Sequence, residues 1–195
     1  MNETRATRTP SDSGSADAPS GTPEGAPVQG IEHWTTKDGV RLFLWEKFVG
    51  TPAGKPVVLF VHGSSMASQP TFDLHVPGRP DSSVMDWFAR RGFACVSVDM
   101  EGYGRSDKSR DIPCDIANGA DDLAAATQYL RERRGVERVL AYGISSGALR
   151  AALFAQRHPE RVARLALDAF VWTGEGAPTL EARRKKLPEF RAQSA

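Results

Sequence analysis

A five-residue motif at residues 143–147, Gly-Ile-Ser-Ser-Gly, holds the side chain best suited to covalent chemistry in this sequence. It fits the pattern Gly-x-Ser-x-Gly, in which a serine lies at a sharp turn between a strand and a helix. A serine hydroxyl in such a turn can attack an ester, thioester or amide carbonyl and form an acyl-serine intermediate. An apolar run precedes the motif and an amphipathic stretch follows it. The sequence therefore predicts that Ser145 is a nucleophile.

The glycines of the motif indicate which of its two serines is the candidate. When a chain turns at once from strand into helix, side chains two residues before and after the turn would collide, so glycine is needed there. Ser145 has Gly143 and Gly147 at these positions. Ser146 would have the branched Ile144 at the first of them. We therefore expect the reactive hydroxyl at Ser145.

Attack on a carbonyl creates a negatively charged oxygen, which backbone N–H groups must stabilise. The N–H of Ser146, at the start of the following helix, is one expected donor. A Val-His-Gly-Ser-Ser loop closes the first buried strand, and the N–H of Ser64 in this loop is expected to be the second. One such donor contributes roughly 3 to 4 kcal/mol of transition-state stabilisation. Before Ser64 come His62 and Gly63, and we expect the His62 side chain to brace the loop rather than to react.

Three landmarks occur here in the order known from one protein family. They are His-Gly at residues 62–63, Asp-Met-Glu-Gly-Tyr-Gly-Arg-Ser at residues 99–106, and the Ser145 motif. Through them the chain resembles the α/β-hydrolase family over about residues 31–171. The resemblance implies an α/β fold with a mostly parallel sheet and with Ser145 at the carboxyl edge of its strands. Glu101 departs from the pattern, because the family often has arginine there to brace the loop.

The partners of the serine are harder to place. The family's chain order is serine, then acid, then histidine. The one histidine after Ser145 is His158, and at 1.5 Å per helical residue it lies roughly 20 Å away. His75 and Asp168 are alternatives for the base and the acid, although structural roles are commoner for both. We therefore interpret the chain as the N-terminal part of a serine hydrolase, nearly inactive alone because its acid and histidine are missing.

A second hypothesis is a non-catalytic module that uses the hydrolase scaffold to bind a ligand or partner. Neither hypothesis requires a cofactor or a metal. The two cysteines, Cys95 and Cys114, have no further cysteine or histidine at metal-ligand spacing. Gly-Tyr-Gly at residues 102–104 resembles the start of a dinucleotide fingerprint, but Asp107 stands where that fingerprint needs glycine.

The elements that must position these residues alternate between strands and helices, which is typical of a parallel sheet. An N-terminal hairpin is expected around an Asp-Gly turn at residues 38–39. The strands of this hairpin are expected at Ile31 to Thr36 and Val40 to Val49. Four further strands, which should be parallel to one another, are expected at Pro56 to Val61, Phe93 to Val98, Val136 to Tyr142 and Val162 to Leu167. The expected helices are Ser83 to Arg91 with Val84, Trp87 and Phe88 facing inward, Ile116 to Arg134, Ser146 to Arg157 and Leu180 to Lys186.

Three segments follow from these patterns. Residues 1–30 contain no Ile, Leu, Phe, Trp or Tyr and are expected to form a disordered tail. Residues 31–172 should form an α/β-hydrolase core that is truncated after the strand following the nucleophile helix, and residues 173–195 the start of a lid or connecting segment. The last strand should then be an apolar edge that favours self-association.

Composition excludes several classes of partner. With 25 Lys and Arg against 24 Asp and Glu, the net charge of +1 gives no general attraction to nucleic acid or to anionic membranes. No apolar stretch approaches the roughly 20 residues that span a bilayer, and the N-terminus lacks the apolar centre of a secretory signal. We expect a small-molecule acyl substrate, a cytoplasmic location, and neither nucleic acid nor a membrane as partner.

Overall fold

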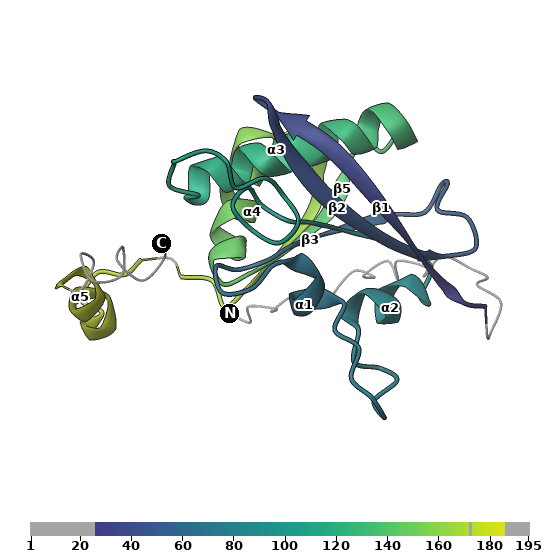
Figure 1. The fold of residues 1–195 in the computed structure, drawn as a ribbon, viewed down its shortest axis with the longest axis horizontal. Coiled ribbons are helices and arrows are strands. Elements are labelled where there is room, and N and C mark those ends of the chain that lie inside the picture. The colour runs from purple at the N-terminus through teal and green to yellow at the C-terminus, as the bar shows by residue number, and fades with distance from the viewer. Residues whose placement is uncertain (1–25, 172, 186–195) are drawn as a thin grey trace, which may run out of the picture.

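The computed structural model of the protein describes residues 26–171 and 173–185. It contains a six-stranded sheet in the order β1-β2-β4-β3-β5-β6 (Figure 1). The strands are β1 (Val28–Lys37), β2 (Val40–Val49), β3 (Val57–Val61), β4 (Ala94–Val98), β5 (Val139–Ile144) and β6 (Val162–Asp168). The N-terminal hairpin is antiparallel, β2 pairs antiparallel with β4, and β4, β3, β5 and β6 are parallel to one another. The predicted α/β fold with a mostly parallel sheet is confirmed.

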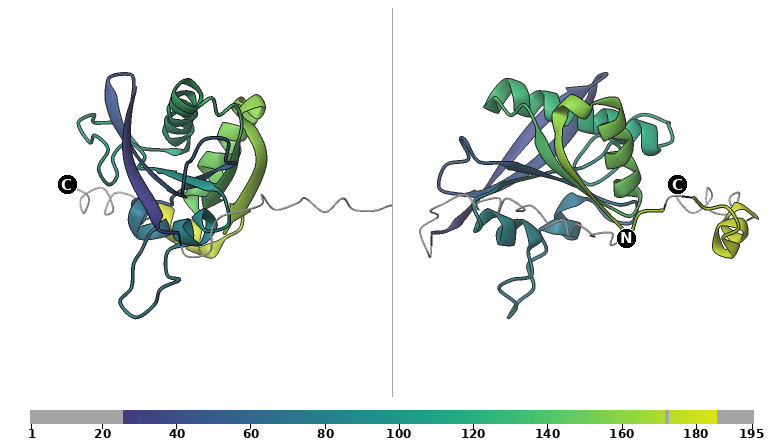
Figure 2. Two further views of the ribbon diagram at one scale, coloured as in Figure 1. Left: turned by 90° about the vertical axis from the view of Figure 1, so that its right-hand side faces the viewer. Right: turned by 180° about the vertical axis from the view of Figure 1, so that it is seen from behind.

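Helices cover both faces of this sheet. On one face lie α3 (Ile116–Arg134) and α4 (Ser146–Arg157), and on the other lie α1 (Ser68–Phe72) and α2 (Val84–Ala89) (Figure 2). Successive residues of β3 face opposite layers, so Leu59 joins the core beneath α3 and α4 while Val58 joins the core beneath α2. A short 3₁₀ helix, Pro159–Arg161, links α4 to β6.

Local signals in the sequence explain the boundaries of these elements. All five residues of β3 and all five of β4 are buried, as expected of apolar runs in a sheet covered on both sides. The Asp115 carboxylate accepts a hydrogen bond of 2.8 Å from the N–H of Asn118 and caps α3. Gly135, with a φ of 63°, ends the same helix in the left-handed region. The predicted bounds of α3 and α4 are confirmed.

β3 and β4 each begin one residue later than predicted, and two other strands begin three residues away from their predicted starts. β1 begins at Val28, so residues 28–30, assigned to the predicted tail, pair with β2. Residues 1–25 of that tail lie outside the described residues. β5 begins at Val139 rather than at residue 136. Residues 136–138 instead lead from the turn at Gly135, which caps α3, towards the sheet.

The inward face predicted for α2 is wrong for two of its three residues. Val84 and Trp87 are about two-fifths exposed, and Met85 is buried in their place. Phe88 does pack against the core beneath α2. The Trp87 ring instead lies under the guanidinium of Arg91, 3.4 Å from the ring centre, where a cation–π interaction replaces burial.

The C-terminal part of the described chain forms α5 (Pro178–Lys185), close to the predicted basic helix, whose last residue lies outside the described range. This helix stands apart from the sheet (Figure 1). Among the helices of the described residues, none combines the length and apolar character needed to cross a bilayer.

Candidate active site

Ser145 occupies the turn between β5 and α4. Its φ of 58° and ψ of −126° are strained for a residue that carries a side chain, and such strain concentrates at functional turns. The Ser145 N–H donates to the carbonyl of Asp168, 3.0 Å away at the end of β6, and the Ser145 carbonyl accepts from the N–H of Ala148. These bonds hold the turn between a sheet strand and a helix. The Ser145 side chain is exposed at the carboxyl edge of the sheet.

The two glycines of the motif are required by close backbone contacts. A Cβ at Gly143 would lie 2.5 Å from the carbonyl oxygen of Gly147. A Cβ at Gly147 would lie 2.2 Å from the carbonyl oxygen of Val61 and 2.5 Å from that of His62. The first turn of α4 therefore rests directly on the end of β3, as the steric reading of the motif anticipates.

Gly147→Ala is expected to destabilise the protein by about 3 kcal/mol, because the added methyl group meets backbone that no side-chain rotation can clear. The urea midpoint measured by circular dichroism would report the loss. Gly54→Ala is the matched control, since a Cβ there meets nothing within 4 Å although φ is +73°. That control should cost about 1 to 2 kcal/mol through backbone strain alone. Equal losses in the two variants would contradict the contact argument.

His62 braces the loop after β3. Its ring is fully buried, Nδ1 lies 2.6 Å from the carbonyl oxygen of Gly63, and Nε2 accepts a 3.1 Å hydrogen bond from the N–H of Met100. Because Nε2 is an acceptor, the ring is neutral with its proton on Nδ1, which donates to Gly63. Burial lowers the pKa of His62 from its usual value. This geometry supports the expected bracing role.

The lowered pKa of His62 predicts a loss of stability in mild acid. The unfolded chain protonates His62 below about pH 6.5, whereas the folded chain keeps it neutral, so stability is full above that pH and declines as pH falls towards the folded pKa. One proton accounts for at most about 1.4 kcal/mol per pH unit. Urea unfolding at pH 7.5, 6.5 and 5.5 should show a steeper decline in the wild type than in His62→Gln.

Arg150 is a buried support of the same loop that sequence reasoning missed. Its side chain is 2% exposed, and its Nη1 donates to the His62 carbonyl over 3.1 Å. A signal was present in the sequence, because Arg150 lies on the apolar face of α4 between Gly147 and Phe154. A guanidinium on the buried stripe of a helix needs acceptors, and here the loop after β3 supplies one.

The loop after β3 and the serine turn are in contact. A Cβ at Gly63 would lie 3.2 Å from the Cβ of Ser145 and 3.6 Å from its Oγ. Ser64, the next residue, is exposed, so its N–H remains the predicted second oxyanion donor. The hydroxyl oxygen of Ser146 is buried and forms no hydrogen bond with any described residue. Of the two adjacent serines, only Ser145 therefore presents its side chain to solvent.

The alternatives for base and acid are engaged elsewhere. His75 Nε2 lies 3.1 Å from Asp73 Oδ1, and the His75 side chain is 60% exposed. The Asp168 carboxylate accepts a 2.6 Å hydrogen bond from the hydroxyl of Tyr142. Burial, together with this bond, raises the pKa of Tyr142 to about 12. Among the described residues no histidine hydrogen-bonds to Ser145.

One group of potential metal ligands is already paired with a lysine ammonium. Asp73, His75 and Asp86 come within reach of a single ion. The ammonium of Lys47, however, lies 2.7 Å from Asp73 Oδ1 and pairs with Asp86 as well. Because the lysine already supplies the positive charge, these residues form an ion-pair cluster that leaves no reason to place a metal there.

Asp99 shapes the loop that follows β4. Its Oδ1 accepts hydrogen bonds from the N–H and hydroxyl of Ser68, and its Oδ2 accepts one of 2.9 Å from the N–H of Arg105. A Cβ at Gly104 would lie 2.0 Å from Asp99 Oδ2, so the loop closes tightly around the carboxylate. Asp99 therefore acts on loop conformation.

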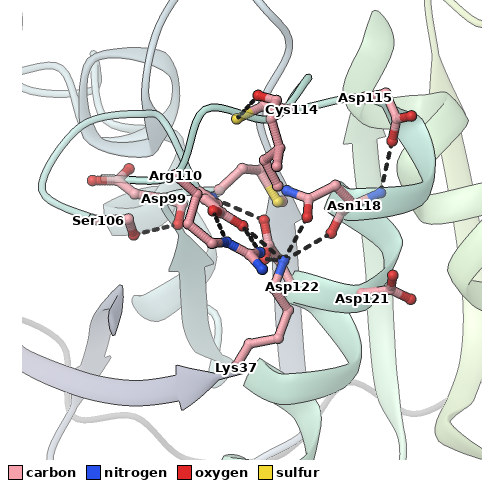
Figure 3. A network of polar contacts seen from close by, with 12 residues as sticks. Lys37, Asp99, Ser106, Arg110, Cys114, Asp115, Asn118, Asp121 and Asp122 are labelled. Atoms are coloured by element: carbon pink, nitrogen blue, oxygen red, sulfur yellow. Dashed lines mark hydrogen bonds and ion pairs between the residues drawn. The ribbon is translucent and has the colours of Figure 1, made fainter. Parts of the chain in front are cut away.

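Glu101 braces the same loop with the opposite charge from the arginine that the family resemblance implies. Figure 3 shows the polar network of this region, in which Lys37, Arg110 and Asp122 lie close together. Arg110 donates two hydrogen bonds to Glu101, at 2.7 and 2.6 Å, and the Lys37 ammonium lies 3.1 Å away. The Arg110 hydrogen bonds, more than the Lys37 contact, lower the pKa of Glu101 to about 2. Lys37 also pairs at 2.5 Å with Asp122, whose carboxylate accepts from the Glu101 N–H. The loop is thus tied to β1 and α3.

A mostly parallel α/β sheet with a strained serine turn at its carboxyl edge places this protein among the α/β hydrolases. The family model described as alpha/beta hydrolase fold matches residues 56–193, which is more than half of the chain. The chain therefore belongs to the alpha/beta hydrolase family.

Individual relatives share parts of the chain. The bifunctional esterase/perhydrolase of Acinetobacter calcoaceticus is 34% identical over 64% of this chain and 39% of its own length. A proline iminopeptidase of Neisseria meningitidis serogroup B is 31% identical over 77% of this chain and 51% of its own. The crystal structure of a predicted CIB-like hydrolase from Thermoplasma acidophilum has a TM-score of 0.56 and 20% identity over 71% of this chain and 62% of that one. The chain thus spans about half the length of these two curated relatives or less.

Proposed function

We propose that this chain carries the nucleophile and oxyanion-binding part of a serine hydrolase that acts on an ester, thioester or amide. The observation that supports it best is the exposed, strained Ser145 at the start of α4, with the Gly63 loop against it. The names of the relatives point the same way, since one is a bifunctional esterase/perhydrolase and another a proline iminopeptidase.

The proposed step begins with attack of Ser145 Oγ on the carbonyl carbon. The new O–C bond forms while the carbonyl electron pair moves to oxygen and the hydroxyl proton passes to a base. The N–H groups of Ser146 and Ser64 would stabilise the oxyanion. Collapse of this intermediate expels the alcohol, thiol or amine with a proton and leaves acyl-Ser145, which water then hydrolyses. No described residue is assigned as the base, so the chain by itself is expected to react slowly.

Further assignments belong to the same proposal. The hydrolase core would begin with β1 at Val28 and run to residue 172, and residues 173–195 would form the beginning of a lid or connecting segment. The protein would act on small acyl compounds in the cytoplasm, without nucleic acid or a membrane as partner. The alternative, a non-catalytic binding module, draws support from the lack of a histidine hydrogen-bonded to Ser145 among the described residues.

Adduct mapping with a fluorophosphonate separates the two functions. The reagent transfers its phosphonyl group to an activated serine oxygen and releases fluoride. After long incubation of the 195-residue chain, peptide mass spectrometry is expected to find the adduct on Ser145. Rapid labelling of Ser145 would show that the chain contains a working base, against the expectation of slow reaction. Adducts spread evenly over exposed serines, or absent altogether, would favour the binding module.

A further inference from the structure

Arg150 of α4 is a buried cation whose partners are backbone carbonyls. The residue is 2% exposed, and among the described residues no carboxylate forms an ion pair with it. Nη1 donates to the carbonyl of His62 over 3.1 Å, and Nη2 donates to that of Cys114 over 3.4 Å. Nε is buried and forms no hydrogen bond with any described residue. Burying a charge without a counter-ion costs more than burying an apolar side chain, so packing alone does not explain an arginine here.

Helix α3 leaves room for this side chain at Gly119. A Cβ there would lie 2.5 Å from Cδ of Arg150 and 2.8 Å from its Nε. Gly119 lies within α3 and its φ is not positive, so the helix itself does not require glycine. The guanidinium carbon of Arg150 lies 5.4 Å from the ring centre of Tyr103, and the Tyr103 ring packs edge-on against that of His62. Arg150 therefore extends from α4, past α3, to the loops that follow β3 and β4.

The two carbonyls at the start of the loop after β3 are each held by a side chain. Arg150 holds the carbonyl of His62, and Nδ1 of the His62 ring lies 2.6 Å from the carbonyl oxygen of Gly63. The Gly63 carbonyl and the Ser64 N–H belong to one planar trans peptide unit, in which they point in opposite directions. Fixing the Gly63 carbonyl therefore fixes the direction of the Ser64 N–H. Arg150 fixes the backbone of His62, from which the ring reaches that carbonyl.

Helix α4 is connected to both sides of the proposed oxyanion hole. Its first residue, Ser146, supplies one N–H, and Arg150, about one turn later, holds the loop that supplies the other. Gly147 approaches the same loop, because a Cβ there would lie 2.5 Å from the His62 carbonyl oxygen. The separation of the two N–H donors therefore depends on how firmly α4 and this loop are joined.

We propose that Arg150 is a positioning residue for the oxyanion hole. By holding the His62 carbonyl it keeps the Ser64 N–H directed at the oxygen that becomes negative when Ser145 attacks. The effect of Arg150 on reactivity rests on the proposed function, whereas its effect on the Ser64 amide does not.

Removal of the guanidinium should slow the reaction of Ser145. Arg150→Met, which keeps an unbranched side chain without donors, should lower the rate of fluorophosphonate labelling by about 10- to 100-fold, because a misplacement of about 1 Å can cost about 10² in rate. Arg150→Lys should have an intermediate rate, since one nitrogen replaces two donors. Arg157→Met, at an exposed arginine of the same helix, is the matched control and should label at the wild-type rate.

Gly119→Ala displaces the arginine without removing it. Alanine favours a helix more than glycine does, but its methyl group would meet the Arg150 side chain. The variant should therefore fold and yet label about tenfold more slowly than the wild type. In an Arg150→Ala background the long side chain is gone, and the same substitution should leave the rate unchanged. Equal effects of Gly119→Ala in the two backgrounds would contradict the proposal.

The Ser64 amide provides a measurement that needs no reactivity at Ser145. In ¹⁵N relaxation experiments, Arg150→Met should lower the order parameter of the Ser64 N–H from about 0.85 to below about 0.6, while the amides of α3 and β3 keep their wild-type values. If Arg150→Met fails to fold, Arg150→Lys and Gly119→Ala serve for the same comparison.

The two measurements separate failure of this proposal from failure of the proposed function. A Ser64 amide that stays as ordered as in the wild type overturns the positioning role, whatever the labelling rate. Where the wild type is labelled at Ser145, an unchanged rate in Arg150→Met overturns it as well. A wild type that is not labelled at Ser145 contradicts the proposed function, and the Ser64 amide alone then decides whether Arg150 holds the loop.

Discussion

Ser145→Ala is expected to lower the rate of fluorophosphonate labelling by about 10³-fold, to that of an ordinary surface serine. Sites that keep an oxyanion hole but lack other members of a catalytic triad retain roughly 10³ to 10⁴ over background. In this chain the residual advantage would come from the strained turn and from the N–H groups of Ser146 and Ser64. Removing the oxygen that the reagent must reach eliminates all of it. The pseudo-first-order rate of labelling, followed by intact mass, measures the effect.

Ser146→Ala is the matched control for that experiment. The Ser146 hydroxyl oxygen is buried, while the backbone N–H, which we propose as an oxyanion donor, is unchanged by the substitution. Labelling should therefore proceed at the wild-type rate. If Ser146→Ala were silent to the reagent and Ser145→Ala were not, the assignment of the nucleophile would be wrong.

Lys37→Met is expected to destabilise the protein by about 3 to 5 kcal/mol, because it removes the cation from two buried carboxylates. The Lys37 ammonium pairs with Glu101 at 3.1 Å and with the fully buried Asp122 at 2.5 Å. Glu101 keeps Arg110 after the substitution, but Asp122 keeps only the backbone N–H of Glu101. Chemical denaturation at pH 7.5 would measure the loss.

Two companion variants identify the cause of that loss. Adding Asp122→Asn to Lys37→Met removes the stranded charge and should recover most of the stability. Arg157→Met, which breaks the exposed pair with Asp121, should cost about 1 kcal/mol or less. Failure of the Asn substitution to rescue would show that packing of the lysine stem, rather than an unpaired carboxylate, accounts for the effect.

Much of the fold could be predicted because its signals are local. The uninterrupted apolar runs of β3 and β4 indicate strands covered on both faces, and the Asp115 and Gly135 caps mark the ends of α3. The Ser145 turn was equally accessible, since glycine spacing expresses a steric requirement within five residues. The inward face of α2 was wrong because an aromatic ring can be covered by a neighbouring arginine on the same helix, as Trp87 is, without entering the core.

The supports of the candidate site could not be predicted because they join distant residues. Arg150 donates to the carbonyl of a residue 88 positions away in the sequence. Lys37, at the end of β1, pairs with Glu101 in the loop after β4 and with Asp122 on α3. Nothing near any one of these residues indicates its partner. Glu101 suggested a loop without its usual brace, whereas the structure holds it through Lys37 and Arg110. Charge pairs of this kind are visible only once the topology is known.

The hydrogen bond from the Ser145 N–H to the Asp168 carbonyl joins the serine turn to the last residue of β6. The ends of strands fray at lower free energy than the interior of a fold. Fraying there would break the hydrogen bond of the Ser145 N–H and let the strained φ of Ser145 relax, while the hydrophobic core stays intact. Warming should therefore lower the reactivity of Ser145 before the protein unfolds, and cooling should restore that reactivity.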